Sequence, residues 1–111
     1  MMHVEAVAAL FPDLQAVELH AWVERRWVEP EAGPEGGLLF QEIDVARVRL
    51  IYDLRHDLAI AEDTVPLILS LVDQVYELRG QLKAVTRAVD TLPQPVREQV
   101  LAALDQAAGW H

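Results

Sequence analysis

The most regular feature of the chain is a run of apolar residues that recur alternately three and four positions apart. Its members are Ile68, Leu71, Val75, Leu78, Leu82, Val85, Val89 and Leu92. This heptad spacing lets the side chains of one helix fit between those of a second helix. Ile and Val dominate one position of the repeat and Leu the other, which favours two strands. We therefore predict that residues 61–92 form a long coiled-coil dimerisation helix. The alternative is a long helix packed only within its own chain.

Ahead of this segment, apolar residues recur at shorter helical spacings. We expect residues 4–10 to form a short helix that stops at Phe11-Pro12, and residues 13–26 to form a second helix capped by Asp13. A third helix is expected at residues 41–58. The residues that it offers for burial are Val45, Val48, Ile51, Tyr52, Leu54 and Leu58.

A turn rich in glycine and proline occupies residues 31–37. Apolar residues flank it on both sides, at 27–28 and at 38–40. Two short apolar segments around such a turn predict a small β-hairpin, or wing. The expected fold is therefore mainly α, with a winged helix-turn-helix domain at residues 1–60 followed by the long helix.

The chain after the heptads is expected to form one more, short helix. Pro93 and Pro95 end the long helix, because proline removes a backbone donor and clashes with the preceding turn. Within the last segment, residues 93–111, the new helix should run over residues 96–108 and stop at Gly109. Its apolar stripe is Val96, Val100, Leu101 and Leu104. A helix this short is marginal alone, so we expect it to pack back on the long helix or on a partner subunit.

Charge narrows the range of partners. The chain has 111 residues and a formal net charge of −9. Residues 1–44 hold nine acidic residues against Arg25 and Arg26, a net charge of −7, and residues 45–111 carry −2. DNA binding needs Lys and Arg to neutralise phosphates, so the first 44 residues are a poor phosphate-binding surface. A basic protein partner suits them better.

The sequence offers little to catalysis or metal binding. It has no cysteine, and its histidines (His3, His20, His56 and His111) lack the spacing of a metal-binding helix motif. The glycines of the turn lie among glutamates, which would repel phosphate. We therefore expect no enzyme activity, no cofactor and no metal. With no signal peptide and no apolar run near 20 residues, we expect a soluble, cytoplasmic protein without membrane contact.

Three tryptophans are candidates for either core or interface positions. For Trp22 and Trp27 we favour the core or the base of the wing. Trp110 lies near the terminus, and we expect it to be exposed or to contact a partner.

Several short motifs together carry a resemblance to a known family. They are Trp27-Val28-Glu29-Pro30, Phe40, Asp53-Leu54-Arg55-His56-Asp57-Leu58, and the stretch from Val65 to Leu78 with Leu69, Leu71, Asp73 and Val75. These motifs and their spacing, over about residues 13–90, resemble the CbpM chaperone modulators. The predicted order of elements also resembles that of MerR-type winged-helix proteins, in which two helices, a wing and a third helix precede a coiled coil.

This resemblance implies a function. CbpM-like proteins bind the J-domain of a CbpA- or DnaJ-like co-chaperone, and they block both its stimulation of a DnaK-type ATPase and its DNA binding. By this resemblance the chain would be an adaptor. The heptads predict that it is a homodimer, and the negative charge predicts that it does not itself bind nucleic acid. J-domains engage DnaK through a basic helix, so an acidic adaptor can occupy the same face. As contact residues we select the acids Asp53, Asp57 and Asp73 along the matched helices.

The main rival is a DNA-binding MerR-type transcriptional regulator. Its recognition helix would lie near residues 13–26, where the only basic residues are Arg25 and Arg26 at the far end. Recognition helices read bases with their N-terminal part, which here holds Asp13 and Glu18. A purely structural dimerisation module with an unrelated partner is a second alternative.

Overall fold

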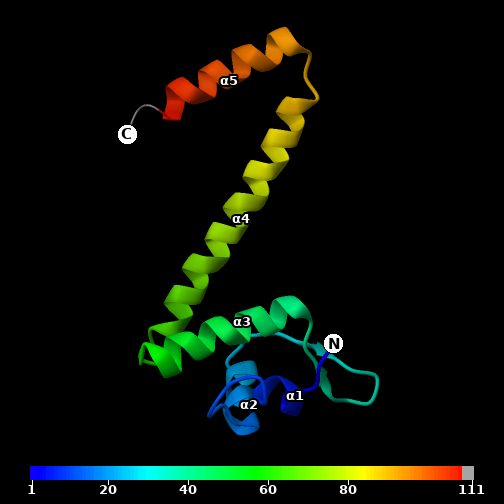
Figure 1. The fold of residues 1–111 in the computed structure, drawn as a ribbon, viewed down its shortest axis with the longest axis vertical. Helices are drawn as coiled ribbons and strands as arrows, with labels where there is room; N and C mark the ends of the chain where they lie inside the picture. The colour runs from blue at the N-terminus through cyan, green and yellow to red at the C-terminus, as the bar shows by residue number, and fades with distance from the viewer. Residues whose placement is uncertain (109–111) are drawn as a thin grey trace. The chain divides into compact units, whose positions relative to one another are not determined.

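A computed structural model describes residues 1–108 of the chain and divides it into two units, Met1–Ser70 and Leu71–His111. The elements are α1 (Val4–Ala8), α2 (Ala16–Glu24), β1 (Glu31–Ala32), β2 (Leu38–Leu39), α3 (Glu42–Tyr52), the π-helix η1 (Asp53–Asp57), α4 (Val65–Asp90) and α5 (Gln94–Ala108), as drawn in Figure 1. The expected mainly helical fold with one small hairpin is confirmed. Among the described residues, no helix is both long enough and apolar enough to cross a membrane.

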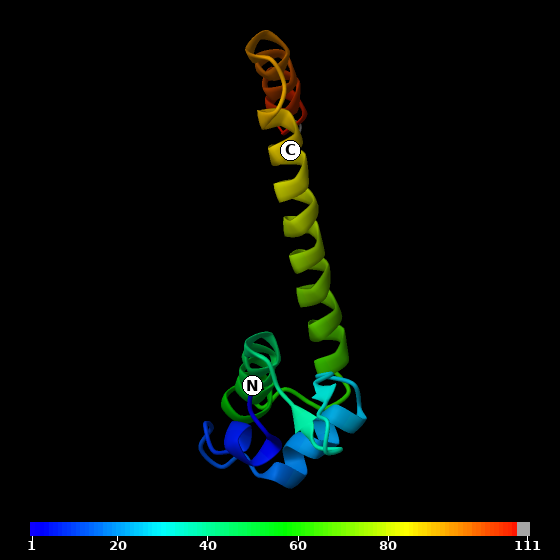
Figure 2. The same ribbon diagram turned by 90° about the vertical axis from the view of Figure 1, so that its right-hand side faces the viewer.

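The first unit has a continuous apolar core. α1 and α2 lie on one side of α3, as both views show (Figures 1 and 2). The side chains buried completely or almost completely include Val7, Leu19, Trp22, Val28, Phe40, Val48, Ile51 and Val65. Trp22 and Trp27 are both buried, with ring centroids 6.5 Å apart, so their predicted core positions are confirmed.

The second helix begins later than predicted. Its N-cap is Gln15, and Asp13 lies two residues ahead of it with φ of 65°, in the left-handed region. Asp is one of the few residues that tolerate this conformation, so Asp13 shapes the turn between the helices instead of capping α2. At the other end α2 stops at Glu24, and Arg26 again has a positive φ, of 62°.

The hairpin forms, but with a different first strand. β1 is Glu31–Ala32, paired antiparallel with β2 so that Glu31 lies opposite Leu39 and Ala32 opposite Leu38. Residues 27–28, expected to lead into the hairpin, are core residues instead, and Arg47 donates a hydrogen bond to the carbonyl of Trp27. Trp27 and Val28 are apolar because they belong to the core, so they are not available to form an exposed strand of the hairpin.

The third predicted helix changes its winding before it ends. The α-helical part stops at Tyr52, and η1 follows with a bond from the Leu58 amide to the Asp53 carbonyl, five residues back, at 3.0 Å. Leu54 points into the core, but Leu58 is 64% exposed, so its predicted burial is wrong. The wider π turn rotates Leu58 away from the stripe that α-helical spacing assigned to it.

α4 starts in the first unit and continues into the second. Val65 and Leu69 are buried in the first core, and Ile68 packs partly against it. Beyond this point the predicted seam is largely exposed: Leu71, Val75, Leu78, Leu82 and Val85 are 48–66% accessible, whereas Val89 is 8% accessible.

α5 starts two residues earlier than predicted, because Pro95 is compatible with the first helical turn. Its stripe is open to solvent, with Val96, Leu101 and Leu104 43–50% accessible. Its packing on α4 or on a second copy therefore stays a prediction. Gly109, Trp110 and His111 lie outside the described residues.

Candidate functional site

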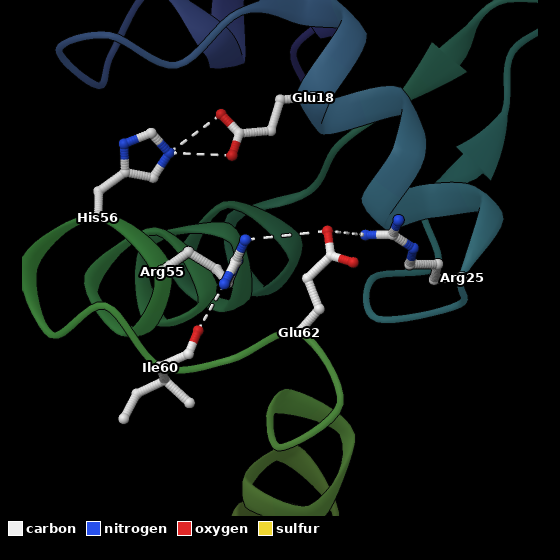
Figure 3. Close-up of polar contacts among 6 residues, drawn as sticks. All are labelled: Glu18, Arg25, Arg55, His56, Ile60 and Glu62. Carbon is white, nitrogen blue, oxygen red and sulfur yellow. Dashed lines mark hydrogen bonds and ion pairs between the residues drawn. The ribbon is translucent and has the colours of Figure 1, made fainter.

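The segment that carries the Leu-Arg-His-Asp-Leu motif is joined to α2 by a contact between the side chains of His56 and Glu18. The His56 Nε2 atom lies 3.0 Å from each carboxylate oxygen of Glu18 (Figure 3). The pair bridges η1 and α2, and both side chains are partly covered. His56 thus connects the end of α3 to the second helix.

A second bridge ties the same segment to the loop before α4. One Arg55 amino group donates to the Ile60 carbonyl, and the other lies 3.8 Å from the Glu62 carboxylate (Figure 3). The same Glu62 oxygen accepts a hydrogen bond from Arg25 at 2.9 Å. Exposed pairs of this kind contribute about 0–1 kcal/mol each, so their main effect is to orient the loop that leads into α4.

Tyr52 is the centre of the neighbouring surface. Its ring stacks on His56 with centroids 4.7 Å apart and lies 5.2 Å from the Phe11 ring. Its hydroxyl donates a hydrogen bond of 2.9 Å to the Pro12 carbonyl. These contacts fasten the turn between α1 and α2 to the end of α3.

Three acids act on this phenol through their charge: Asp13, Asp53 and Asp57. Desolvation, and then the negative charges of Asp57, Asp13 and Asp53, raise the pKa of Tyr52 above its ordinary value of 10.0. We call Tyr52 with these acids the acidic face. Its charges attract cations and repel phosphate, so a basic peptide surface is the chemistry that it suits.

Two of the three residues selected from the sequence fall on this face. Asp53 is half-buried and Asp57 is exposed, and both lie on η1. Asp73 lies on α4 in the second unit, exposed and engaged in an interaction of its own. Sequence reasoning missed Glu18, because its partner His56 is 38 positions away and such a pair leaves no local pattern. Asp13 was recognised only as a helix cap.

The basic side chains of the first unit are mostly used within it. The unit has thirteen acidic and five basic residues, a net charge of −8. Arg25 and Arg55 share Glu62, Arg47 bonds a carbonyl, and the Arg49 guanidinium lies over the Phe11 ring at 5.0 Å. Few cations are left to contact an external anion, so the surface of the unit is predominantly acidic.

A hollow of about 210 Å³ is lined by Met1, Met2, Phe40, Glu42 and Val45. It is smaller than the roughly 300–1,000 Å³ of typical ligand pockets. Within residues 1–108, no group of three or more His, Cys, Asp or Glu side chains is arranged to hold a metal ion.

Comparison with known proteins returned no match: no family model fits the chain, and no curated protein or solved structure is significantly similar to it.

Proposed function

We propose that this protein is an adaptor that binds the J-domain of a CbpA- or DnaJ-like co-chaperone. The observation that carries the proposal is the acidic face, which lies on the segment whose sequence resembles the CbpM modulators. Asp53 and Asp57 flank Tyr52 there, on a unit with a net charge of −8. A J-domain offers the complementary chemistry, because it engages its DnaK-type partner through a basic helix.

The mechanism follows from competition for that helix. A J-domain whose basic face is covered by the adaptor is unable to present it to the ATPase or to DNA at the same time. Charge complementarity between the two surfaces accelerates their encounter and disfavours partners of the same sign. No chemical step by the adaptor is needed, and we propose that it has no enzyme activity and works in the cytoplasm.

We further propose that the adaptor is a homodimer joined by the seam of α4. The seam residues from Leu71 to Val85 are apolar, in heptad register, and about half exposed or more in the single chain. Apolar side chains repeated in this way along one helix are typical of a surface that a second helix covers.

The decisive experiment is calorimetry of the full-length protein with a purified J-domain of the CbpA type. We expect binding that weakens as salt rises, because opposite charges steer the association. Absence of heat and of any competition with the DnaK-type ATPase would refute the adaptor function.

A gel-shift assay separates this proposal from the DNA-binding regulator. At about 150 mM salt, where charges more than about 8 Å apart are screened, we expect no retention of duplex DNA below micromolar protein. Tight retention would favour the regulator.

A further inference from the structure

We propose that α5 is the second half of the dimer interface: in the assembled protein each α5 folds back antiparallel along the paired α4 helices and completes a four-helix bundle. This inference rests on the proposed α4 dimer. It gives residues 94–108 a role, since their apolar face would be covered when a second copy of this chain binds.

The first reason is the composition of the positions that flank the seam. In two-stranded coils these positions often carry charges that pair between strands. Here, from residue 72 to residue 88, they are Val72, Gln74, Arg79, Gln81, Thr86 and Ala88. Arg79 is the one charged residue among these six. Uncharged flanks fit a bundle, in which a third and a fourth helix cover the sides of the seam.

The second reason is the exposure of α5 itself. Val96, Leu101 and Leu104 are 43–50% accessible, similar to the seam of α4. Ala103 and Ala107 lie at the edge of the same stripe, whereas Glu98 and Asp105 lie on the opposite side of the helix. The helix therefore has one face for a protein core and one for water, and in the single chain most of the first face is exposed, with Val100 half-buried.

The third reason is the connection between the helices. Only residues 91–93 separate α4 from α5, a length typical of antiparallel helix pairs. With about 1.5 Å per residue in both helices, folding back about Leu92 sets Val96 level with Ala88, Val100 with Ala84 and Leu104 with Gly80. Val89, at this junction, is the one seam residue beyond Ser70 that is already buried.

The fourth reason is interface size and charge. A stable interface engages roughly 20–30 residues a side. The seam and flanks from residue 71 to residue 92 supply thirteen, and the α5 stripe (Val96, Val100, Leu101, Ala103, Leu104 and Ala107) raises the number to nineteen. The net charge of the second unit is −1, so two copies approach without the repulsion that the first unit, at −8, would produce.

The test is a pair of full-length variants with equal added charge. Val100→Glu/Leu104→Glu places carboxylates on the stripe, and Gln99→Glu/Gln106→Glu places them on the polar side. Sedimentation equilibrium should give a dimer dissociation constant raised about 100-fold by the first variant, because carboxylates would be buried without partners, and changed less than about threefold by the control. Leu104 is exposed in the single chain, so the fluorescence of Trp22 and Trp27 should stay native in both variants.

Disulfide trapping tests directly whether α5 lies along α4. The chain has no cysteine of its own, so only the introduced pair can react. Leu104→Cys with Gln81→Cys should form a disulfide on oxidation, whereas Gln106→Cys with Gln81→Cys should not. Equal dissociation constants for the two glutamate variants, or a wild-type monomer, would overturn the bundle. J-domain binding is read separately by calorimetry: a wild-type dimer that responds to the stripe variant but binds no J-domain upholds the bundle and refutes the adaptor.

Discussion

The two units of the chain differ in the burial of their apolar residues: most are buried in the first unit and exposed in the second. Of the sixteen apolar residues that are buried within residues 1–108, fifteen lie in the first unit, and the exception is Val89. In the described part of the second unit nine large apolar side chains are exposed: Leu71, Val75, Tyr76, Leu78, Leu82, Val85, Val96, Leu101 and Leu104. The hydrophobic effect scales with apolar area removed from water, so the first unit has its main stabilising term within one chain and the second does not.

The two units therefore differ in the role that we propose for each, partner binding for the first and dimerisation for the second. The first unit is a self-contained carrier for the acidic face, and its polar bridges fix the turn and the loop on either side of Tyr52. The second unit is the part of the chain that we propose to be completed by association with a second copy. Variants in the first unit should therefore affect its folding or partner binding, whereas variants in the second unit should affect dimerisation.

The largest effect is expected from charges in the seam. Leu78→Glu/Leu82→Glu would bury four unpaired carboxylates in each dimer, at a cost of several kcal/mol per buried charge. Light scattering should show a monomer. The first unit should keep its near-ultraviolet circular dichroism, because both leucines are exposed in the single chain. A wild-type protein that is itself monomeric at tens of micromolar would contradict the seam.

The next largest effect is expected in the first core. Leu19 is fully buried, so Leu19→Ala should destabilise the first unit by about 2–5 kcal/mol in urea unfolding, followed by the fluorescence of Trp22 and Trp27 in a Trp110→Phe background. Leu82→Ala is the matched change in the second unit, where the side chain is 66% exposed. It should leave this transition unchanged while weakening the dimer. Equal losses in the fluorescence transition would show that the two units do not unfold independently.

A smaller effect is expected from the acids. Asp53→Lys/Asp57→Lys/Asp73→Lys should weaken J-domain binding at least tenfold, or about 1.4 kcal/mol, with fold and dimer intact by circular dichroism and light scattering. The matched control reverses three exposed acids of the second unit: Glu77, Asp90 and Asp105. Because Asp73 lies in a different unit from the other two, Asp53→Lys/Asp57→Lys measured alone shows whether the first unit carries the contact. Equal binding by wild type and triple variant would place the contact elsewhere.

Much of the helical framework was predictable, because its signals are local. The α4 heptad, the prolines before α5 and the glycine-rich turn all act over a few residues. The predictions that were wrong depended on contacts between distant parts of the sequence or on an unusual backbone conformation. Residues 27–28 are apolar because they are buried, and nothing in the sequence distinguished that role from a strand. The π turn at Asp53–Asp57 moved Leu58 to the surface against the α-helical period.

The candidate site was predictable only in part for the same reason. Asp53 and Asp57 were selected because they flank a motif on one element. Asp13 joins them through the turn ahead of α2, and Glu18 meets His56 across 38 positions. Contacts of this kind depend on the packing of α2 against α3, which local periodicity does not encode.

The smallest effect concerns the titration of Tyr52, and it tests the acidic face without any partner. Desolvation and the charges of Asp57, Asp13 and Asp53 raise the pKa of the phenol, so the folded protein holds this proton more tightly than the unfolded chain does. The resulting stability is fully present below pH 10.0, the ordinary pKa, and is lost as pH rises through the higher folded value. In a Tyr76→Phe background, where Tyr52 is the only tyrosine, tyrosinate absorbance should rise above pH 10.0. Asp57→Asn should lower the midpoint of the titration, because it removes the negative charge that raises the pKa of Tyr52 most. Added salt should lower the midpoint as well, because it screens the charges of the acids. A midpoint at or below 10.0 that neither change moves would show that the three acids do not converge on Tyr52 in solution.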